Sequence, residues 1–303
     1  MVAVHRHGDR SGRPARCVSS PVGEIDAVAR SGMRMTIRGA RWVLRSRLAE
    51  RPTLYLPLAR RKYRDSVVSE ATELVIDGFT RSAVTFATTA FQMSQDPPVR
   101  VAHTLHSAGH LIAAARRGLP ALVTIREPDE TALSTVIREP YISLRQALTA
   151  YTRFYTKIEP YRSHFVIGTF DEITTDFGHV IRKVNERFGT RFGEFEHDEG
   201  NVAECYAIIE DRARRPPWST ALGEFECGII TFAEYRRTVD TYRARGEVPS
   251  RLVPERRVQR PSDERARLKH ELRAALESPT LDAARLRARS AFEALTSGWP
   301  AIG

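Results

Sequence analysis

The chain has 303 residues, of which 42% are apolar and 28% are charged, so a sizeable core is expected and wholesale disorder is excluded. The formal net charge is +10. Residues 1–65 hold fifteen basic and five acidic side chains, which leaves 32 of each sign in the other 238 residues. The basic excess therefore belongs to an N-terminal arm, and this placement argues against nucleic-acid binding by the folded core.

We expect this arm, residues 1–65, to be partly disordered. Residues 1–33 carry no periodic pattern, residues 38–50 have helical apolar spacing that Pro52 ends, and residues 53–70 are interpreted as an extended basic connector. A solvated tail is one interpretation of the arm. Weak peripheral contact with an anionic membrane surface is the other.

The three cysteines, Cys17, Cys205 and Cys227, form no CxxC pair and are odd in number. Neither a disulfide framework nor a zinc site is expected, and no metal is predicted. The longest apolar stretches fall far below the ~20 residues that span a bilayer. A reducing cytoplasm fits both observations, so we expect a cytoplasmic protein.

Short apolar runs alternate with helical patterns from residue 73 onward. The expected strands are 73–77, 99–104, 121–127 and 164–170. The expected helices are 82–94, 107–117, one that Asp129 caps, 142–155 and 174–188. Strands that alternate with helices predict an α/β fold, a three-layer sandwich around a central parallel sheet.

The C-terminal part has weaker patterns. Residues 190–262 contain prolines and many charges, and we expect long loops and short helices there, lying as a lid over the mouth of the site. Residues 265–276 and 283–295 have helical spacing. Residues 66–303 are therefore expected to form one α/β domain with extra C-terminal helices.

The most informative segment runs from Gly78 to Phe86. A strand ends, a glycine turns the chain, and a helix begins at Ser82, which we expect to cap it. The free N–H groups and positive dipole of a helix N-terminus suit an anion. Arg81 adds a forked cation, and Ser82 and Thr85 add hydroxyls. An ordinary strand-to-helix turn is the alternative interpretation.

The segment differs from a nucleotide-kinase P-loop, which requires G-x-x-x-x-G-K-[ST]. Ala83 stands at the second glycine position and Val84 at the lysine position. ATP with magnesium is therefore a poor fit.

The segment Gly78-Phe-Thr-Arg-Ser-Ala-Val-Thr-Phe86 resembles the 5′-phosphosulfate loop of the sulfotransferase family. That loop usually has a proline, Lys or Arg, Ser, Gly, two threonines and an aromatic residue or Leu. Arg81, Ser82 and Thr85 match this pattern. The resemblance implies that the donor is bound by Thr80, Arg81, Ser82, Ala83, Val84, Thr85 and Phe86.

A second segment, residues 125–134, looks like the 3′-phosphate segment of the same family. It has Arg126 at a strand end, an acidic residue, Pro128, and Ser134 eight positions after the arginine. The resemblance implies that Arg126 and Ser134 reach one phosphate. A weaker match covers 165–173, so that the likeness spans about residues 70–192 and implies a P-loop nucleoside-triphosphate-hydrolase-like fold.

The resemblance implies transfer of a sulfuryl group from 3′-phosphoadenosine 5′-phosphosulfate, a co-substrate, to a hydroxyl or amine. The acceptor would be a glycan, a lipid or another small molecule. Arg81 and the loop amides would stabilise charge on the leaving oxygen without a metal. The alternatives are a nucleotide-dependent phosphotransferase and a catalytically inactive nucleotide-binding protein.

The expected base is His106, in the segment His103-Thr-Leu-His106 at the end of the second strand. The family often has a Lys-Thr-His-like segment there, and His106 takes the place of its histidine. Histidine titrates near neutral pH, which suits a general base. His103 and Glu127 are the alternative bases. A late motif that closes on the 3′-phosphate has only a loose candidate in Arg243, Arg245 and Gly246.

Overall fold

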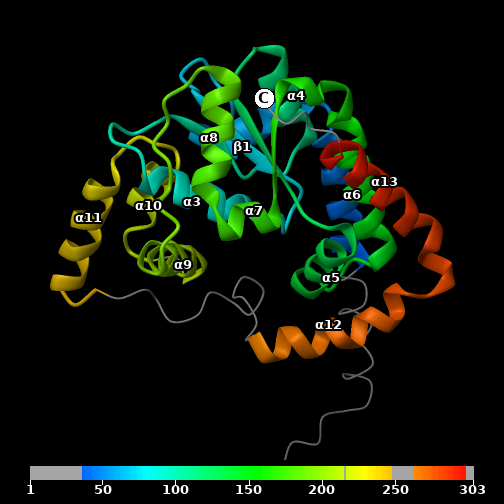
Figure 1. The fold of residues 1–303 in the computed structure, drawn as a ribbon. Helices are drawn as coiled ribbons and strands as arrows, with labels where there is room; N and C mark the ends of the chain where they lie inside the picture. The colour runs from blue at the N-terminus through cyan, green and yellow to red at the C-terminus, as the bar shows by residue number, and fades with distance from the viewer. Residues whose placement is uncertain (1–35, 215, 248–261, 298–303) are drawn as a thin grey trace, which may run out of the picture.

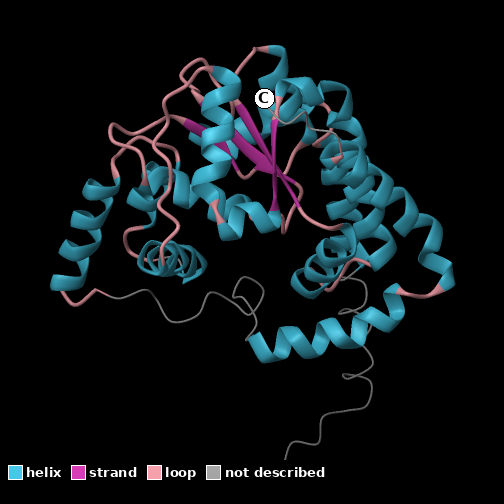
Figure 2. Ribbon diagram, in the orientation of Figure 1, coloured by secondary structure: helices cyan, strands magenta, loops and turns pink. Residues whose placement is uncertain are grey.

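The computed structural model describes residues 36–214, 216–247 and 262–297, and these contain a four-stranded sheet. Its strands lie in the order β2-β1-β3-β4, and every neighbouring pair is parallel. The strands are β1 (Leu74–Gly78), β2 (Val101–His103), β3 (Ala121–Ile125) and β4 (Val166–Thr169). The expected α/β class with a central parallel sheet is confirmed (Figure 2).

Successive strand residues face opposite sides of the sheet, so each strand contributes to two cores. On β1, Val75 packs into the larger core, and Leu74 and Ile76 pack into the smaller one. The larger core includes α2 (Pro52–Tyr63), α4 (Ala108–Arg116), α5 (Pro128–Arg138), α6 (Leu144–Ile158) and α13 (Asp282–Thr296). The smaller core includes α3 (Val84–Met93), α7 (Phe170–Thr175), α8 (Phe177–Phe188) and α9 (Glu199–Arg214). Helices thus cover both faces of the sheet, in three layers (Figure 1).

Several helix boundaries differ from expectation, because the helices are capped at residues other than those expected. The helix before residue 94 begins after Ala83, with no side-chain cap, and not after Ser82. Glu127, rather than Asp129, caps α5 by accepting from the N–H of Glu130. The helix expected over 174–188 is divided, because Asp176 ends α7 and caps α8. Gly189 ends α8 in the left-handed conformation, as expected.

The second half of the N-terminal arm is folded. Residues 36–48 form a helix, which confirms the helical spacing there. The extended connector expected over residues 53–70 is wrong, because α2 and a short 3-10 turn, η1 (Arg64–Ser66), occupy most of it. The helix buries Tyr55, Leu56 and Ala59, an i, i+1, i+4 set that packs against α4. Residues 1–33 lie outside the described part of the chain.

Residues 190–262 are more regular than expected. Besides α9, they contain α10 (Ser219–Glu226) and α11 (Phe232–Ala244), which share a small core around Trp218, Phe225 and Tyr235. The helix expected after residue 265 is α12 (Ser262–Leu276), which lies across the bottom of Figure 1 and packs on α5. The other 3-10 turns are η2 (Glu159–His164) and η3 (Pro279–Leu281). Within the described ranges, no helix has both the length and the apolar character of a bilayer span.

Candidate functional site: a cationic cleft at the strand ends

A cleft of about 760 Å³ lies at the carboxyl ends of the strands. The parallel sheet brings the loops after β1, β2 and β3 to this edge, which is the usual ligand edge of such sheets. Three segments expected to hold site residues meet here, although 54 positions separate the first residue from the last. The expected residues that line the cleft are Thr80, Arg81, Ala83, Val84, Thr85, Phe86, His106, Arg126 and Ser134.

The loop after β1 presents an open helix N-terminus. Ala83 is the N-cap of α3 at φ 70°, and no side chain caps the helix. Among the described residues, the backbone N–H groups of Val84, Thr85 and Phe86 meet no protein acceptor. Because these donors and the helix dipole point to one place, the loop is suited to bind an anion.

Ser82 departs from the expectation that its hydroxyl contacts the ligand. Its side chain is buried and does not line the cleft. Its Oγ donates to the Phe79 carbonyl at 2.6 Å and lies 2.7 Å from Thr124 Oγ1 on β3. Ser82 therefore holds the loop against the sheet, while its backbone remains part of the loop.

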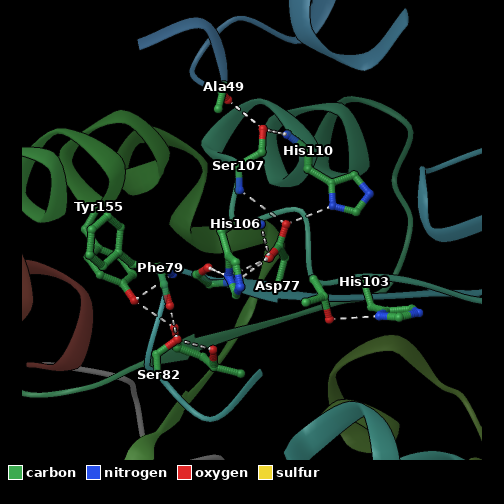
Figure 3. Close-up of polar contacts among 12 residues, drawn as sticks. Ala49, Asp77, Phe79, Ser82, His103, His106, Ser107, His110 and Tyr155 are labelled. Atoms are coloured by element: carbon green, nitrogen blue, oxygen red, sulfur yellow. Dashed lines mark hydrogen bonds and ion pairs between the residues drawn. The ribbon is translucent and has the colours of Figure 1, made fainter. Parts of the chain in front are cut away.

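Gly78 allows this close approach. A Cβ at Gly78 would lie 2.2 Å from the Thr124 carbonyl oxygen and 2.8 Å from Ser82 Oγ. Tyr155 completes the support, because its hydroxyl donates to the Thr124 carbonyl at 2.8 Å and accepts from the Phe79 N–H at 3.2 Å. The loop is thus fixed by buried neutral hydrogen bonds before any ligand binds (Figure 3).

The two segments of the resemblance are in direct contact. Arg81 Nε donates to Ser134 Oγ at 2.8 Å, from the β1 loop to α5. Burial and, after it, the neighbouring cations Arg138, Arg126 and Arg265 together lower the pKa of Arg81 to about 10. Arg81 is still charged at pH 7, so the cleft holds crowded positive charge that an anionic ligand would relieve.

Arg126 reaches the cleft from the end of β3. Its guanidinium stacks on the Phe170 ring at 4.0 Å and lies 3.5 Å from Glu130 Oε2. The stacking orients the planar guanidinium, which has donors to spare for a second anion.

The α12 helix adds cations that the sequence did not assign to the site. Arg265 and Lys269 line the cleft. Lys269 pairs with Glu130 of α5, and Arg273 Nη2 donates to the same carboxylate at 2.8 Å. The i, i+4 spacing of Arg265 and Lys269 on a polar helix was the available signal.

His106 lies at the end of the β2 loop, with about a third of its side chain exposed toward the cleft. Its Nδ1 is 3.0 Å from the Gly78 carbonyl, which can only accept, so Nδ1 carries the ring hydrogen. Nε2 then has the free lone pair, and no protein partner meets it among the described residues. Burial lowers the pKa of His106 against the opposing effect of Asp77, so the ring is neutral at pH 7 and fit to accept a proton.

Asp77, on β1, organises this region and was missed by sequence reasoning. Its buried carboxylate accepts from the N–H groups of Gly78 and His106, both at 2.9 Å, and of Ser107 at 3.4 Å. His110 Nδ1 donates to it at 2.9 Å (Figure 3). His110 Nδ1 carries the hydrogen because His110 Nε2 accepts from the Val68 N–H. Burial has the largest single effect and raises the pKa of Asp77, but the hydrogen bond and charge of His110, the charge of His106 and the Gly78 N–H together outweigh it, so the pKa of Asp77 is lowered.

The two alternative bases have other partners. His103 is buried, with Nδ1 2.8 Å from Thr104 Oγ1 and Nε2 3.5 Å from Cys227 Sγ, away from the cleft. Burial lowers the pKa of His103 to about 3. Glu127 uses its carboxylate to cap α5 and does not line the cleft.

Of the aromatic residues and the late basic residues considered in the sequence, some line the cleft and others do not. Tyr206 of α9 lines the cleft and lies 5.4 Å from the Phe86 ring, whereas Trp218 and Tyr235 are core residues. Arg243 stacks over Trp218 and pairs with Asp211, so it lies outside the cleft lining. Arg245 and Gly246 do not line the cleft either, whereas Arg265 and Lys269 of α12 do. Within the described ranges, no cluster of three or more His, Cys, Asp or Glu side chains is arranged to hold a metal ion.

Comparisons with protein-family models, curated proteins and solved structures found no match to this chain. The assignment of a function therefore depends on the cleft itself.

Proposed function

We propose that the protein is a sulfotransferase with a P-loop-like fold that uses 3′-phosphoadenosine 5′-phosphosulfate as donor. One observation carries this proposal. Two anion-binding segments, the β1 loop and Arg126 to Ser134, line one cleft together with a neutral histidine whose Nε2 is free. A ligand with two separate anionic groups, one of which is transferred to a nucleophile, makes use of all three features.

The residues fit such a donor. The open N-terminus of α3 and Arg81 would hold the phosphosulfate group, and Arg126 with α12 would hold the 3′-phosphate. The aromatic residues that line the cleft, Phe86, Tyr141, Phe170 and Tyr206, offer planar surfaces for a base to stack on. Thr80 and Thr85 add hydroxyls on the loop side.

In the proposed reaction, an acceptor hydroxyl loses its proton to His106 Nε2 as its oxygen bonds to sulfur. The bond from sulfur to the bridging oxygen breaks, and the nucleoside bisphosphate leaves with the electron pair. Arg81 and the loop N–H groups stabilise charge on that oxygen. The Gly78 carbonyl and the Asp77 carboxylate, 3.9 Å from Nδ1, stabilise the imidazolium that forms.

A phosphotransferase is the second candidate, and the loop disfavours it. Val84 stands where a kinase lysine would reach the β- and γ-phosphates. An inactive nucleotide-binding protein would have no use for a neutral histidine oriented through Nδ1.

Calorimetry with 3′,5′-adenosine bisphosphate, ADP, and ATP with magnesium tests the proposal. We expect the bisphosphate to bind most tightly. Arg126→Ala should weaken the bisphosphate by about 10- to 150-fold, the loss of a charge-assisted bond, and leave 5′-AMP nearly unchanged. The exposed Arg191→Ala is the matched control. Preference for ATP with magnesium, or equal losses for both ligands, would refute the assignment.

Labelled donor tests turnover. Donor carrying labelled sulfate, incubated with acceptor fractions from cells, should label an acceptor with the wild-type chain. The His106→Gln variant should bind the bisphosphate as wild type and transfer at least about a hundredfold more slowly. Full transfer by this variant would remove His106 from the mechanism.

A further inference from the structure

The first two helices expose large apolar side chains that the fold does not use. Four of the seven markedly exposed large apolar residues of the described chain lie here: Ile37 at 51%, Leu44 at 59%, Leu54 at 48% and Leu58 at 53%. Ile37 and Leu44 are seven residues apart and Leu54 and Leu58 four apart, so each pair lies on one side of its helix. The opposite side of α2 is the one that packs on α4.

The two helices form one unit near their junction. Arg45 Nη2 is 3.5 Å from the Tyr55 hydroxyl. The connection between the helices is fixed to α4, since the Ala49 carbonyl accepts from Ser107 Oγ at 2.5 Å and from the Gly109 N–H at 2.8 Å. The exposed leucines are therefore held in place on an anchored hairpin.

The same stretch is strongly basic. Residues 36–64 contain nine arginines and lysines and one acidic residue, Glu50. Glu50 is paired with Arg153 of α6 at 2.8 Å. Exposed basic residues occur three or four positions from the leucines along the chain: Arg41, Arg47, Arg51, Arg61 and Lys62. We call the four apolar residues and these five basic residues the N-terminal face.

We propose that the N-terminal face binds the surface of an anionic lipid bilayer. Exposed aliphatic side chains among arginines are suited to insert at the boundary of head groups and acyl chains while the cations contact lipid phosphates. Nucleic acid would use the charges but not four aliphatic side chains. A partner that matches both the basic and the aliphatic side chains of the N-terminal face must be anionic and apolar. An anionic bilayer surface has both properties.

Vesicle co-sedimentation of the full chain tests this proposal. We expect binding to phosphatidylglycerol vesicles at low salt, and little binding to phosphatidylcholine vesicles. Leu44→Ser/Leu54→Ser/Leu58→Ser should lower the vesicle affinity by at least roughly tenfold. Leu286→Ser changes a still more exposed leucine, on α13, and is the control that should bind as wild type.

A charge variant keeps the test decisive if the leucine variant folds poorly. Arg41→Glu/Arg47→Glu/Arg61→Glu changes only exposed side chains and should also weaken binding at least tenfold, since each basic residue contributes a factor of about five. Unchanged binding by either folded variant would overturn the proposal. The proposal would also be overturned if the wild-type chain formed a dimer that either variant dissociates. It would equally be overturned if the leucine substitutions lowered thermal stability while vesicle binding persisted. In both cases the N-terminal face would be covered by protein. Both readouts are independent of sulfuryl transfer.

Discussion

The two sides of the cleft are held in place by different forces. On the strand side, Asp77, Ser82 and Tyr155 are buried and bonded to backbone groups of the sheet and loops. On the α5 side, Glu130 and Asp129 pair with partly exposed cations of α12 and α13. Removal of one partner from a buried hydrogen bond greatly lowers the free energy of unfolding, whereas surface ion pairs contribute little to it and are screened by salt. The strand side therefore fixes the geometry of the cleft, and the α5 side contributes its charge.

The largest expected effect is that of Asp77→Ala. Four donors would lose their acceptor inside the protein, and breaking such a buried network lowers the free energy of unfolding by about 3–5 kcal/mol. Urea unfolding at pH 7 measures it, with the exposed Asp171→Ala as control. A loss below about 1 kcal/mol would contradict the assigned role of the strand side.

Acidification should also lower the free energy of unfolding through a residue on the strand side, His103. Below pH 6.5 the unfolded chain protonates His103, whereas the folded state keeps it neutral down to about pH 3. The unfolded state therefore binds more protons, and stability falls with acidification by about 1.4 kcal/mol per pH unit in this window. Urea unfolding at pH 7.5, 6.0 and 5.0 should show a smaller slope for His103→Gln. The exposed His164→Gln should keep the wild-type slope, and equal slopes for all three proteins would disprove the assignment.

Removal of two hydroxyls from the same segment, those of Ser82 and Thr85, should have opposite effects on stability and on ligand binding. Ser82→Ala removes a buried bonded hydroxyl and should lower the free energy of unfolding by about 1–3 kcal/mol. Thr85→Ala changes a residue that lines the cleft, so it should leave stability within about 0.5 kcal/mol and weaken the bisphosphate severalfold. Denaturation and calorimetry on the pair measure both quantities. Equal stability losses would mean that the loop is not divided between support and ligand contact.

The smallest effect is expected for Glu130→Gln on the α5 side. The free energy of unfolding should fall by less than about 1 kcal/mol, because the partner cations are partly exposed. The bisphosphate should bind up to about fivefold more tightly, since a negative charge leaves the cleft. Glu186→Gln, on the exposed side of α8, is the control. A large stability loss would show that the two sides are not held differently.

Local patterns predicted the fold well where chain neighbours determine the outcome. The alternation of apolar runs and helices from residue 73 gave the parallel sheet, and Gly189 gave a helix end. The cap positions were less predictable, because Ser82 and Glu127 each had several acceptors or donors in reach and only the packed structure selects one. The prediction of an extended connector over residues 53–70 was wrong because the many basic residues there obscured the spacing of the apolar positions that contact α4.

The site was predictable where it follows strand ends and not where it comes from distant helices. Arg81, Arg126, Ser134 and His106 all follow strands of one sheet, so topology alone brings them to one edge. Arg265 and Lys269 lie more than 120 residues after the last of these strand-end loops, and no local pattern links α12 to α5. Asp77 was hidden by its position within an apolar run, where a carboxylate is stable only with its four donors.

The helix over residues 36–48 has neighbours on both of its sides. Arg38 lines the cleft, and Gly39 packs so closely on the chain before α6 that a Cβ there would lie 2.8 Å from the Tyr141 carbonyl oxygen. Ile37, next to them, faces solvent. A surface held through Ile37 and a ligand held through Arg38 would therefore contact the same helix, and their binding free energies are linked to the extent that both favour the same position of that helix. Whatever factor a cleft ligand gains when the surface is present, the surface must gain when the ligand is present.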